Sequence, residues 1–145
     1  WLRKEGCPWD EETCCEAARY GHLETLQWAR DAGCSWDEKT CWGAALGGRL
    51  KTLQWAREHG CPWNKRTCVR AAREGHLKVL QWLREERCPW DAYTCYWAFN
   101  KGHLELLRWP LEKECPYYRQ SIKTITNPNF LKWFKRFERE RRPMK

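Results

Sequence analysis

The chain has 145 residues and a formal net charge of +8, and ten of its residues are cysteine and twelve are tryptophan. This length suits a single domain. No stretch of 18 apolar residues and no leader with a cleavage site is found, which argues against a membrane or secreted protein, so we expect an intracellular protein, cytoplasmic or nuclear.

A period of 27 residues organises the chain. In each copy a cysteine comes first, an aromatic residue follows two positions later, and in four copies a glycine lies near the middle. A fixed period of this length predicts a solenoid, in which each unit buries its apolar face against its neighbours. We therefore divide residues 1–113 into a partial unit and four full units, at 1–5, 6–32, 33–59, 60–86 and 87–113.

Each full unit is expected to begin with a short helix. In the second full unit, Asp37 stands where an N-cap residue accepts hydrogen bonds from the first turn. Cys41, Ala44 and Ala45 follow at the spacing that lines one helix face, and they are small enough to let neighbouring helices approach closely. Gly48 ends the helix, because glycine adopts a left-handed backbone without steric cost. The equivalent residues are the caps Asp10, Asn64 and Asp91 and the glycines Gly21, Gly75 and Gly102.

A second helix is expected after each glycine, so that a unit forms a helical hairpin. In the unit 33–59 this helix carries Leu50 and Leu53 and ends near Gly60. In three units it opens with a histidine, which we expect to hydrogen-bond across units. The tryptophan after each turn recurs too strictly for a free surface ring, so we expect it to lie between consecutive layers. These residues are His22, His76 and His103, with Arg49 in the second unit, and Trp9, Trp36, Trp63 and Trp90.

One segment resembles a known family. From Thr13 to Leu23 the chain reads Thr-Cys-x-x-Ala-Ala-x-x-Gly-His-Leu, and Gln-Trp-Ala-Arg and Gly-Cys come after it. This pattern resembles the ankyrin repeat, over residues 7 to about 113. The resemblance implies an all-α solenoid of stacked helix-turn-helix units whose first helices line a concave binding face. Because the family's unit has about 33 residues, it also implies that the projecting β-hairpin fingers are reduced here to tight turns.

The repeat changes towards the C-terminus. Pro110 stands inside the last second helix, which we expect to kink or stop early because proline lacks the N–H and collides with the preceding turn. Ile122 and Ile125 replace the small residues of the first helix, so we expect 114–137 to be a divergent capping unit. The charged end, 138–145, is expected to be a partly disordered basic tail.

The sequence offers no catalytic constellation, so we expect neither an enzyme nor a cofactor. The cysteines lack the close pairs of a structural zinc site, which argues against a metal. Equivalent positions in stacked helices lie about 10 Å apart, beyond the reach of a disulfide, so we expect all ten cysteines to be thiols in a reducing compartment.

The positions that differ between units lie on the first helices. In the ankyrin-like arrangement they form a ladder across the concave face, and they include tryptophan, tyrosine and arginine, the residue types that dominate binding interfaces. We therefore predict a monomeric module that binds another protein through this ladder. The candidate partner-binding residues are Glu12, Glu16, Arg19, Lys39, Trp42, Arg66, Arg70, Arg73, Tyr93, Tyr96 and Trp97.

Charge leaves an alternative open. The chain runs from an acidic first unit to a basic end, and arginine with aromatic rings also suits single-stranded nucleic acid. The alternative prediction is nucleic-acid binding through the third unit and the basic tail at Arg139, Arg141 and Arg142.

Overall fold

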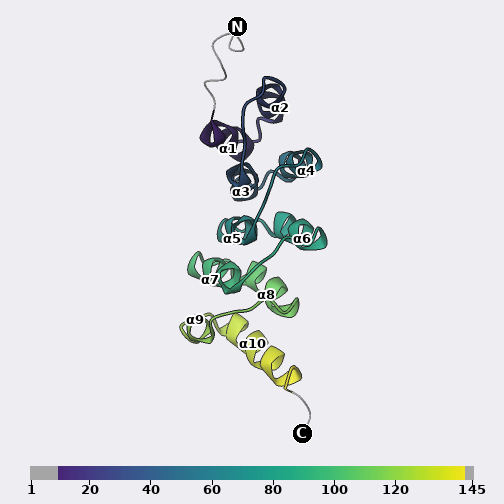
Figure 1. Ribbon diagram of the computed structural model, residues 1–145. Coiled ribbons are helices and arrows are strands. Elements are labelled where there is room, and N and C mark those ends of the chain that lie inside the picture. The colour runs from purple at the N-terminus through teal and green to yellow at the C-terminus, as the bar shows by residue number, and fades with distance from the viewer. Residues whose placement is uncertain (1–9, 143–145) are drawn as a thin grey trace.

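The structure is a computed structural model that describes residues 10–142, and within this range its regular elements are all helices. The helices form an elongated stack, with α1 and α2 at one end and α9 and α10 at the other (Figure 1). In chain order they are α1 (Glu11–Arg19), α2 (Leu23–Asp31), α3 (Glu38–Leu46), α4 (Leu50–Glu58), α5 (Lys65–Arg73), α6 (Leu77–Glu85), α7 (Ala92–Asn100), α8 (Leu104–Glu112), α9 (Arg119–Lys123) and α10 (Pro128–Glu140).

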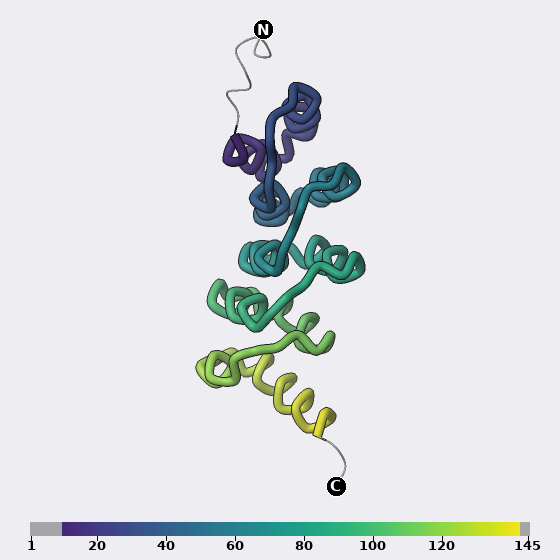
Figure 2. Tube along the Cα trace, in the orientation of Figure 1, coloured from purple at the N-terminus to yellow at the C-terminus, as the bar shows by residue number. Residues whose placement is uncertain are grey.

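The stack has two rows. The first helices of the units, α1, α3, α5 and α7, lie above one another with α9 below them, and the second helices form the other row (Figures 1 and 2). Each of the helices α1 to α8 has nine residues, so every unit repeats the same hairpin. The prediction of an all-α chain of repeated helical hairpins is confirmed at this level.

The first helices begin where their caps predict. The side chain of Asp37 accepts a hydrogen bond from the backbone N–H of Lys39, and Asn64 accepts one from Arg66 in the same way, each at 2.9 Å. Asp10 and Asp91 cap α1 and α7 likewise. The predicted apolar stripe is also confirmed, because Cys41, Ala44 and Ala45 are completely buried.

The hairpin turn depends on a glycine and on the next unit's imidazole. Gly48 has a φ of +69°, and a Cβ there would clash with the ring of His76. That ring closes over the turn, and its Nε2 lies 3.0 Å from the backbone O of Leu46. His103 makes the equivalent contact with Arg73 O, and Arg49 reaches Arg19 O with its Nε. The expected hydrogen bonds across units are therefore confirmed at these three positions.

Side-chain size sets different spacings in the two rows. Consecutive first helices pack directly on one another, whereas consecutive second helices do not approach as closely. A Cβ at Gly43 or Gly47 would overlap the backbone carbonyl of Cys15 or Arg19, which shows how closely α3 approaches α1. Since the first-helix row is the more tightly spaced one, it lies on the inner side of any curvature of the stack.

Tryptophans separate the second helices at three of the four expected positions, and the fourth, Trp9, lies outside the described residues. The ring of Trp63 lies between Arg57 of α4, whose guanidinium carbon is 3.9 Å from the ring centroid, and Trp82 of α6, at 5.8 Å between centroids. Arg57 also donates to the carbonyl of Cys61 at 2.7 Å, so it is fixed to the turn. Trp36 and Trp90 make equivalent pairs of contacts with Arg30 and Trp55 and with Arg84 and Trp109.

The C-terminal part closes the apolar core with larger side chains. Phe130, Phe134 and Phe137 of α10 are buried, and Ile122 of α9 is buried beside them in the same core. The helix continues to Glu140, three residues past the boundary of about 137 expected for the capping unit and into the segment 138–145 expected to be a partly disordered tail. The reason is amphipathicity, because the phenylalanine stripe and the Arg136–Glu140 ion pair, at 2.8 Å, favour helix up to that point.

Two further expectations are wrong in part: the early stop of the last second helix and the thiol state of every cysteine. The helix α8 does not stop early at Pro110, because this residue lies in its last turn, where only one helical bond is lost and the buried ring packs in the core. The expectation that every cysteine is a thiol fails at Cys34, which is disulfide-bonded. Cys34 lies in the turn between α2 and α3, whereas Cys61, Cys88 and Cys115 in the equivalent turns are free thiols.

Candidate functional site

The candidate partner-binding residues all lie on the first-helix row. They belong to α1 (Glu12, Glu16, Arg19), α3 (Lys39, Trp42), α5 (Arg66, Arg70, Arg73) and α7 (Tyr93, Tyr96, Trp97). Each of these side chains is exposed or half-buried. We call this set the first-helix surface; its C-terminal part and its N-terminal part differ in shape and in charge.

The C-terminal part contains two adjoining hollows. The first, of about 430 Å³, lies between α5 and α7, and the second, of about 700 Å³, lies between α7 and α9. Tyr93 and Trp97 line both, so the hollows form one continuous feature, which we call the aromatic–arginine groove. Its lining residues are Lys65, Arg66, Val69, Arg70, Arg73, Asp91, Tyr93, Tyr96, Trp97, Tyr118, Arg119, Gln120 and Ser121.

The aromatic rings of the groove pack edge to face. Tyr96 lies 5.5 Å from Trp97 and 6.1 Å from Tyr93 between ring centroids, and Tyr93 lies 5.6 Å from Tyr118. This geometry is the one that aromatic pairs prefer, so the rings support each other. Tyr93 and Tyr118 nevertheless remain 51% and 43% exposed, which leaves apolar surface open in the groove.

Three arginines of α5 are held by tryptophans. The guanidinium carbons of Arg66 and Arg70 lie 5.4 Å and 6.0 Å from the ring centroid of Trp42, and that of Arg73 lies 4.8 Å from Trp97. Trp42 is itself fixed, because its indole Nε1 donates to Asn64 Oδ1 at 3.1 Å. The groove is therefore organised before any partner binds.

The charges of the groove are unevenly compensated. Lys65 pairs with Asp91 at 2.9 Å, Arg73 with Glu74 at 3.4 Å, and Arg119 with Glu138 at 2.8 Å. In the part of the chain that the structure describes, no carboxylate pairs with Arg66 or Arg70. The positive charge available to a partner is thus concentrated on these two side chains.

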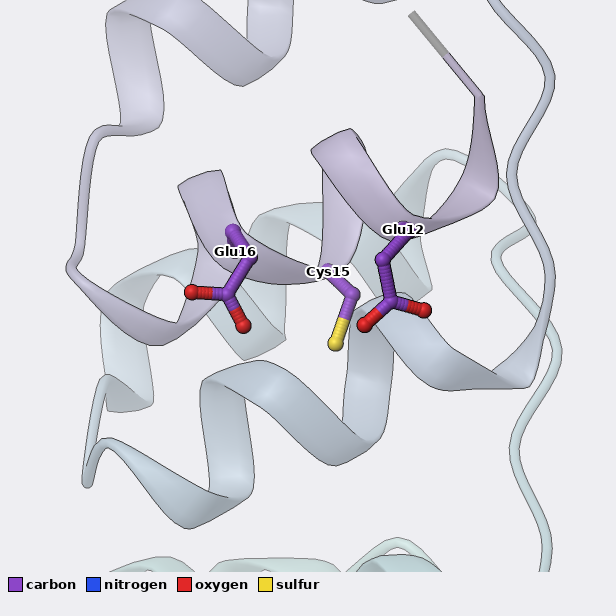
Figure 3. Close-up of side chains that lie close together, drawn as sticks. All are labelled: Glu12, Cys15 and Glu16. Atoms are coloured by element: carbon purple, nitrogen blue, oxygen red, sulfur yellow. The ribbon is translucent and has the colours of Figure 1, made fainter.

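The N-terminal part is acidic. Glu12, Cys15 and Glu16 project from one face of α1, with their ligand atoms within 4.8 Å of one another (Figure 3). Lys39 lies 3.6 Å from Glu12 and Arg19 lies 3.7 Å from Glu16, so each carboxylate already has a cation. Burial, and then the charges of the two glutamates, raises the pKa of Cys15 to about 11. A protonated thiol is a poor metal ligand, so we assign no metal to this cluster.

The tail arginines are not among the groove-lining residues. Arg139 is in α10, and Arg141 donates to the carbonyl of Glu112 at 3.0 Å and lies over the ring of Phe137 at 4.6 Å. Arg142 is exposed at the end of the described range. These three residues line neither hollow of the groove.

Some groove residues were not among the candidates. Lys65 and Val69 complete the face of α5, and a full count of its i, i+3 and i+4 neighbours would have included them. Tyr118 and Arg119 come from the capping unit, where Tyr118 stands at the N-cap position that Asp or Asn occupies in the other units, so comparison with those units gave no signal for them.

Comparisons with known proteins add no relative. No family model matches the chain, and no curated protein is significantly similar to it. Among the described helices, none is both long enough and apolar enough to cross a membrane. A function must therefore be argued from the surface itself.

Proposed function

We propose that the chain is a non-catalytic, monomeric protein-interaction module, an ankyrin-like solenoid that binds a partner protein on its concave first-helix surface. The observation that carries this proposal is the aromatic–arginine groove, which lies on the row where the units differ from one another. The residues that recur from unit to unit are the ones that pack in the core and between the helices. The groove is where the repeat is replaced by exposed tyrosines and unpaired arginines.

The ankyrin-like arrangement is supported by the hairpins and their spacing. Each unit has two nine-residue helices joined through a left-handed glycine, and the first helices pack more closely than the second. Stacks with one tightly spaced row curve towards that row, which makes the first-helix surface concave. Only short turns link one unit to the next, so the binding area falls on the first helices themselves.

The groove has the physical properties of a binding hot spot. Tyrosine, tryptophan and arginine are enriched among the residues that dominate interface energies. Here they are held in place by ring-to-ring contacts and by cation–π contacts. A preorganised surface loses less conformational entropy on binding, so more of the contact energy remains as affinity.

The groups that usually perform catalysis serve packing instead. Three cysteines on the first helices, Cys41, Cys68 and Cys95, are almost completely buried, and a hydrogen bond with a neighbouring thiol, together with burial, raises the pKa of each. His76 and His103 hydrogen-bond to backbone carbonyls of the preceding unit. These roles support a scaffold, and the free thiols support an intracellular, reducing setting, to which Cys34 is the exception.

Nucleic-acid binding through the tail is the weaker proposal. Arg141 is engaged with Glu112 and Phe137, while Glu138 and Glu140 lie beside Arg139 and pair with other arginines. These contacts reduce the positive charge that phosphates would meet. The tail is therefore a weaker candidate than the groove for binding an anionic partner.

The proposal is tested by affinity capture with three forms of the chain. Wild type is compared with Tyr93→Ala/Arg70→Glu, which alters the groove, and with Lys51→Glu/Lys78→Glu, which changes exposed lysines of α4 and α6. We expect proteins retained by wild type to be retained by the second-helix variant and lost from the groove variant. Retention of the same proteins by all three forms would contradict the proposal.

A further inference from the structure

The least compensated charge in the groove is a pair of guanidinium groups. Arg66 and Arg70 are four residues apart on α5, so they project from the same helix face. The ring of Trp42 holds both, and among the described residues neither has a carboxylate partner. The equivalent positions of α1 are Glu12 and Glu16, which carry the opposite charge.

Such a pair is suited to carboxylates. A guanidinium presents planar N–H donors that match a carboxylate, and it is weakly hydrated, so it binds anions at interfaces more readily than an ammonium does. Because the Trp42 contacts restrain both side chains in advance, less rotamer entropy is lost when an anion binds. The acidic α1 repels the same anion and confines it to the α5–α9 part of the surface.

The neighbouring hollow takes an apolar side chain. It has a volume of about 700 Å³ and is lined mainly by Tyr93, Tyr96, Trp97 and Tyr118. The rings pack edge to face with one another, at interplanar angles of 76° to 84°. Rings engaged in this way form the walls of a pocket and do not present the parallel platforms on which bases stack, which favours a peptide over single-stranded nucleic acid.

We propose that the aromatic–arginine groove recognises an acidic linear segment of a partner protein, in which Asp or Glu side chains pair with Arg66 and Arg70 and an adjacent aromatic or large aliphatic side chain enters the hollow beside Tyr93 and Tyr118. This inference rests on the proposed function, because it specifies the partner of the same surface. It also predicts how the segment lies in the groove: its carboxylates lie over α5, and its apolar side chain lies between α7 and α9.

The test is selection from a library of short random peptides against the full chain, followed by fluorescence anisotropy of a labelled selected peptide. We expect the selected peptides to be rich in Asp and Glu next to an aromatic or aliphatic residue. Arg66→Glu/Arg70→Glu should weaken binding by at least about tenfold, since paired arginines in a groove act as hot spots. Lys51→Glu/Lys78→Glu, the same change of charge on α4 and α6, should leave the affinity nearly unchanged.

The contribution of the apolar hollow is tested separately, with a matched control. Tyr93→Ala and Tyr118→Ala should each weaken the same peptide, whereas Tyr20→Ala, which removes a tyrosine that is 52% exposed outside the groove, should not. All of these residues are on the surface, so circular dichroism should show the same helix content in every variant.

Three results would overturn the inference in distinguishable ways. Selected peptides that lack acidic residues, yet lose binding when Tyr93 is changed, would refute the acidic segment and leave the proposed function standing. A library that yields no binder would refute the acidic segment, and the affinity capture with the groove variant would then decide the proposed function. A labelled oligothymidylate that binds more tightly than any peptide and is released by Arg66→Glu/Arg70→Glu would replace the peptide with single-stranded nucleic acid.

Discussion

At the scale of single residues, each unit of this chain is joined to the next by a few directional contacts between otherwise small side chains. The imidazole of His76 covers the turn at Gly48 and bonds to the carbonyl of Leu46, so it joins the units 33–59 and 60–86. His22 occupies the equivalent position in the first unit, but its side chain is exposed.

His76→Ala should therefore destabilise the fold. Loss of the hydrogen bond and of the ring's packing is expected to lower the free energy of unfolding by about 1–3 kcal/mol. His22→Ala serves as the control and should change it little. Urea unfolding followed by circular dichroism measures both, and equal effects of the two changes would contradict this role for His76.

Cys15 gives a second prediction at this scale. Its pKa is raised to about 11 by burial and then by Glu12 and Glu16, so little of the thiol is ionised at mildly alkaline pH. Since the thiolate is the reactive form, Glu12→Gln/Glu16→Gln should lower this pKa and speed alkylation of Cys15. Peptide mass spectrometry after timed iodoacetamide treatment gives the rate. Glu24→Gln on α2 is the control, and an unchanged rate in the double variant would refute the electrostatic part of this account.

At the scale of helices, the sequence predicted most of the boundaries because their causes are local. Each cap Asp or Asn precedes its helix, and the glycine at Gly48 has the positive φ that its position demanded. The errors arose where tertiary packing decided the outcome. Pro110 stays helical because its ring is buried, and α10 continues past 137 because its phenylalanines face the core. Tyr118 was not placed in the groove, since the other units use the equivalent position for a helix cap.

The side chain of Asn64 accepts two hydrogen bonds at the start of α5, and this gives a prediction at the scale of helices. Its side-chain oxygen accepts from Arg66 N and also from the indole of Trp42, at 2.9 Å and 3.1 Å. Asn64→Ala should cost about 1–2 kcal/mol for the cap alone and more with the indole left unpaired. In a Trp42→Phe background the cost should be smaller. Thermal unfolding of the four forms measures this coupling, and strictly additive effects would show that the two contacts are independent.

At the scale of the whole molecule, stability passes from unit to unit, because each unit buries its apolar face only against its neighbours. The capping helix α10 matters in this respect, since Phe130 is almost completely buried at the end of the core. Phe130→Ala should cost about 3–5 kcal/mol locally. Hydrogen exchange should then accelerate most in α8 to α10 and least in α3 and α4, whereas uniform acceleration would indicate a single cooperative unit.

At this scale, residues that serve packing can be separated from residues proposed to serve binding. Repetition explains the buried cysteines and the tryptophans between second helices without any chemistry, and the first-helix surface is where the units depart from the repeat. The residues of α5 and α7 that the sequence singled out do line one groove. We expect the partner to contact that groove.

Oxidative footprinting of the chain with and without a partner recovered by affinity capture tests this claim most directly. Tyr93 and Tyr118, which are exposed in the groove, should lose reactivity in the complex, while Tyr20, outside the groove, and Trp28 on α2 should keep theirs. Protection of Trp28 with Tyr93 and Tyr118 unchanged would place the partner on the second helices and contradict the account.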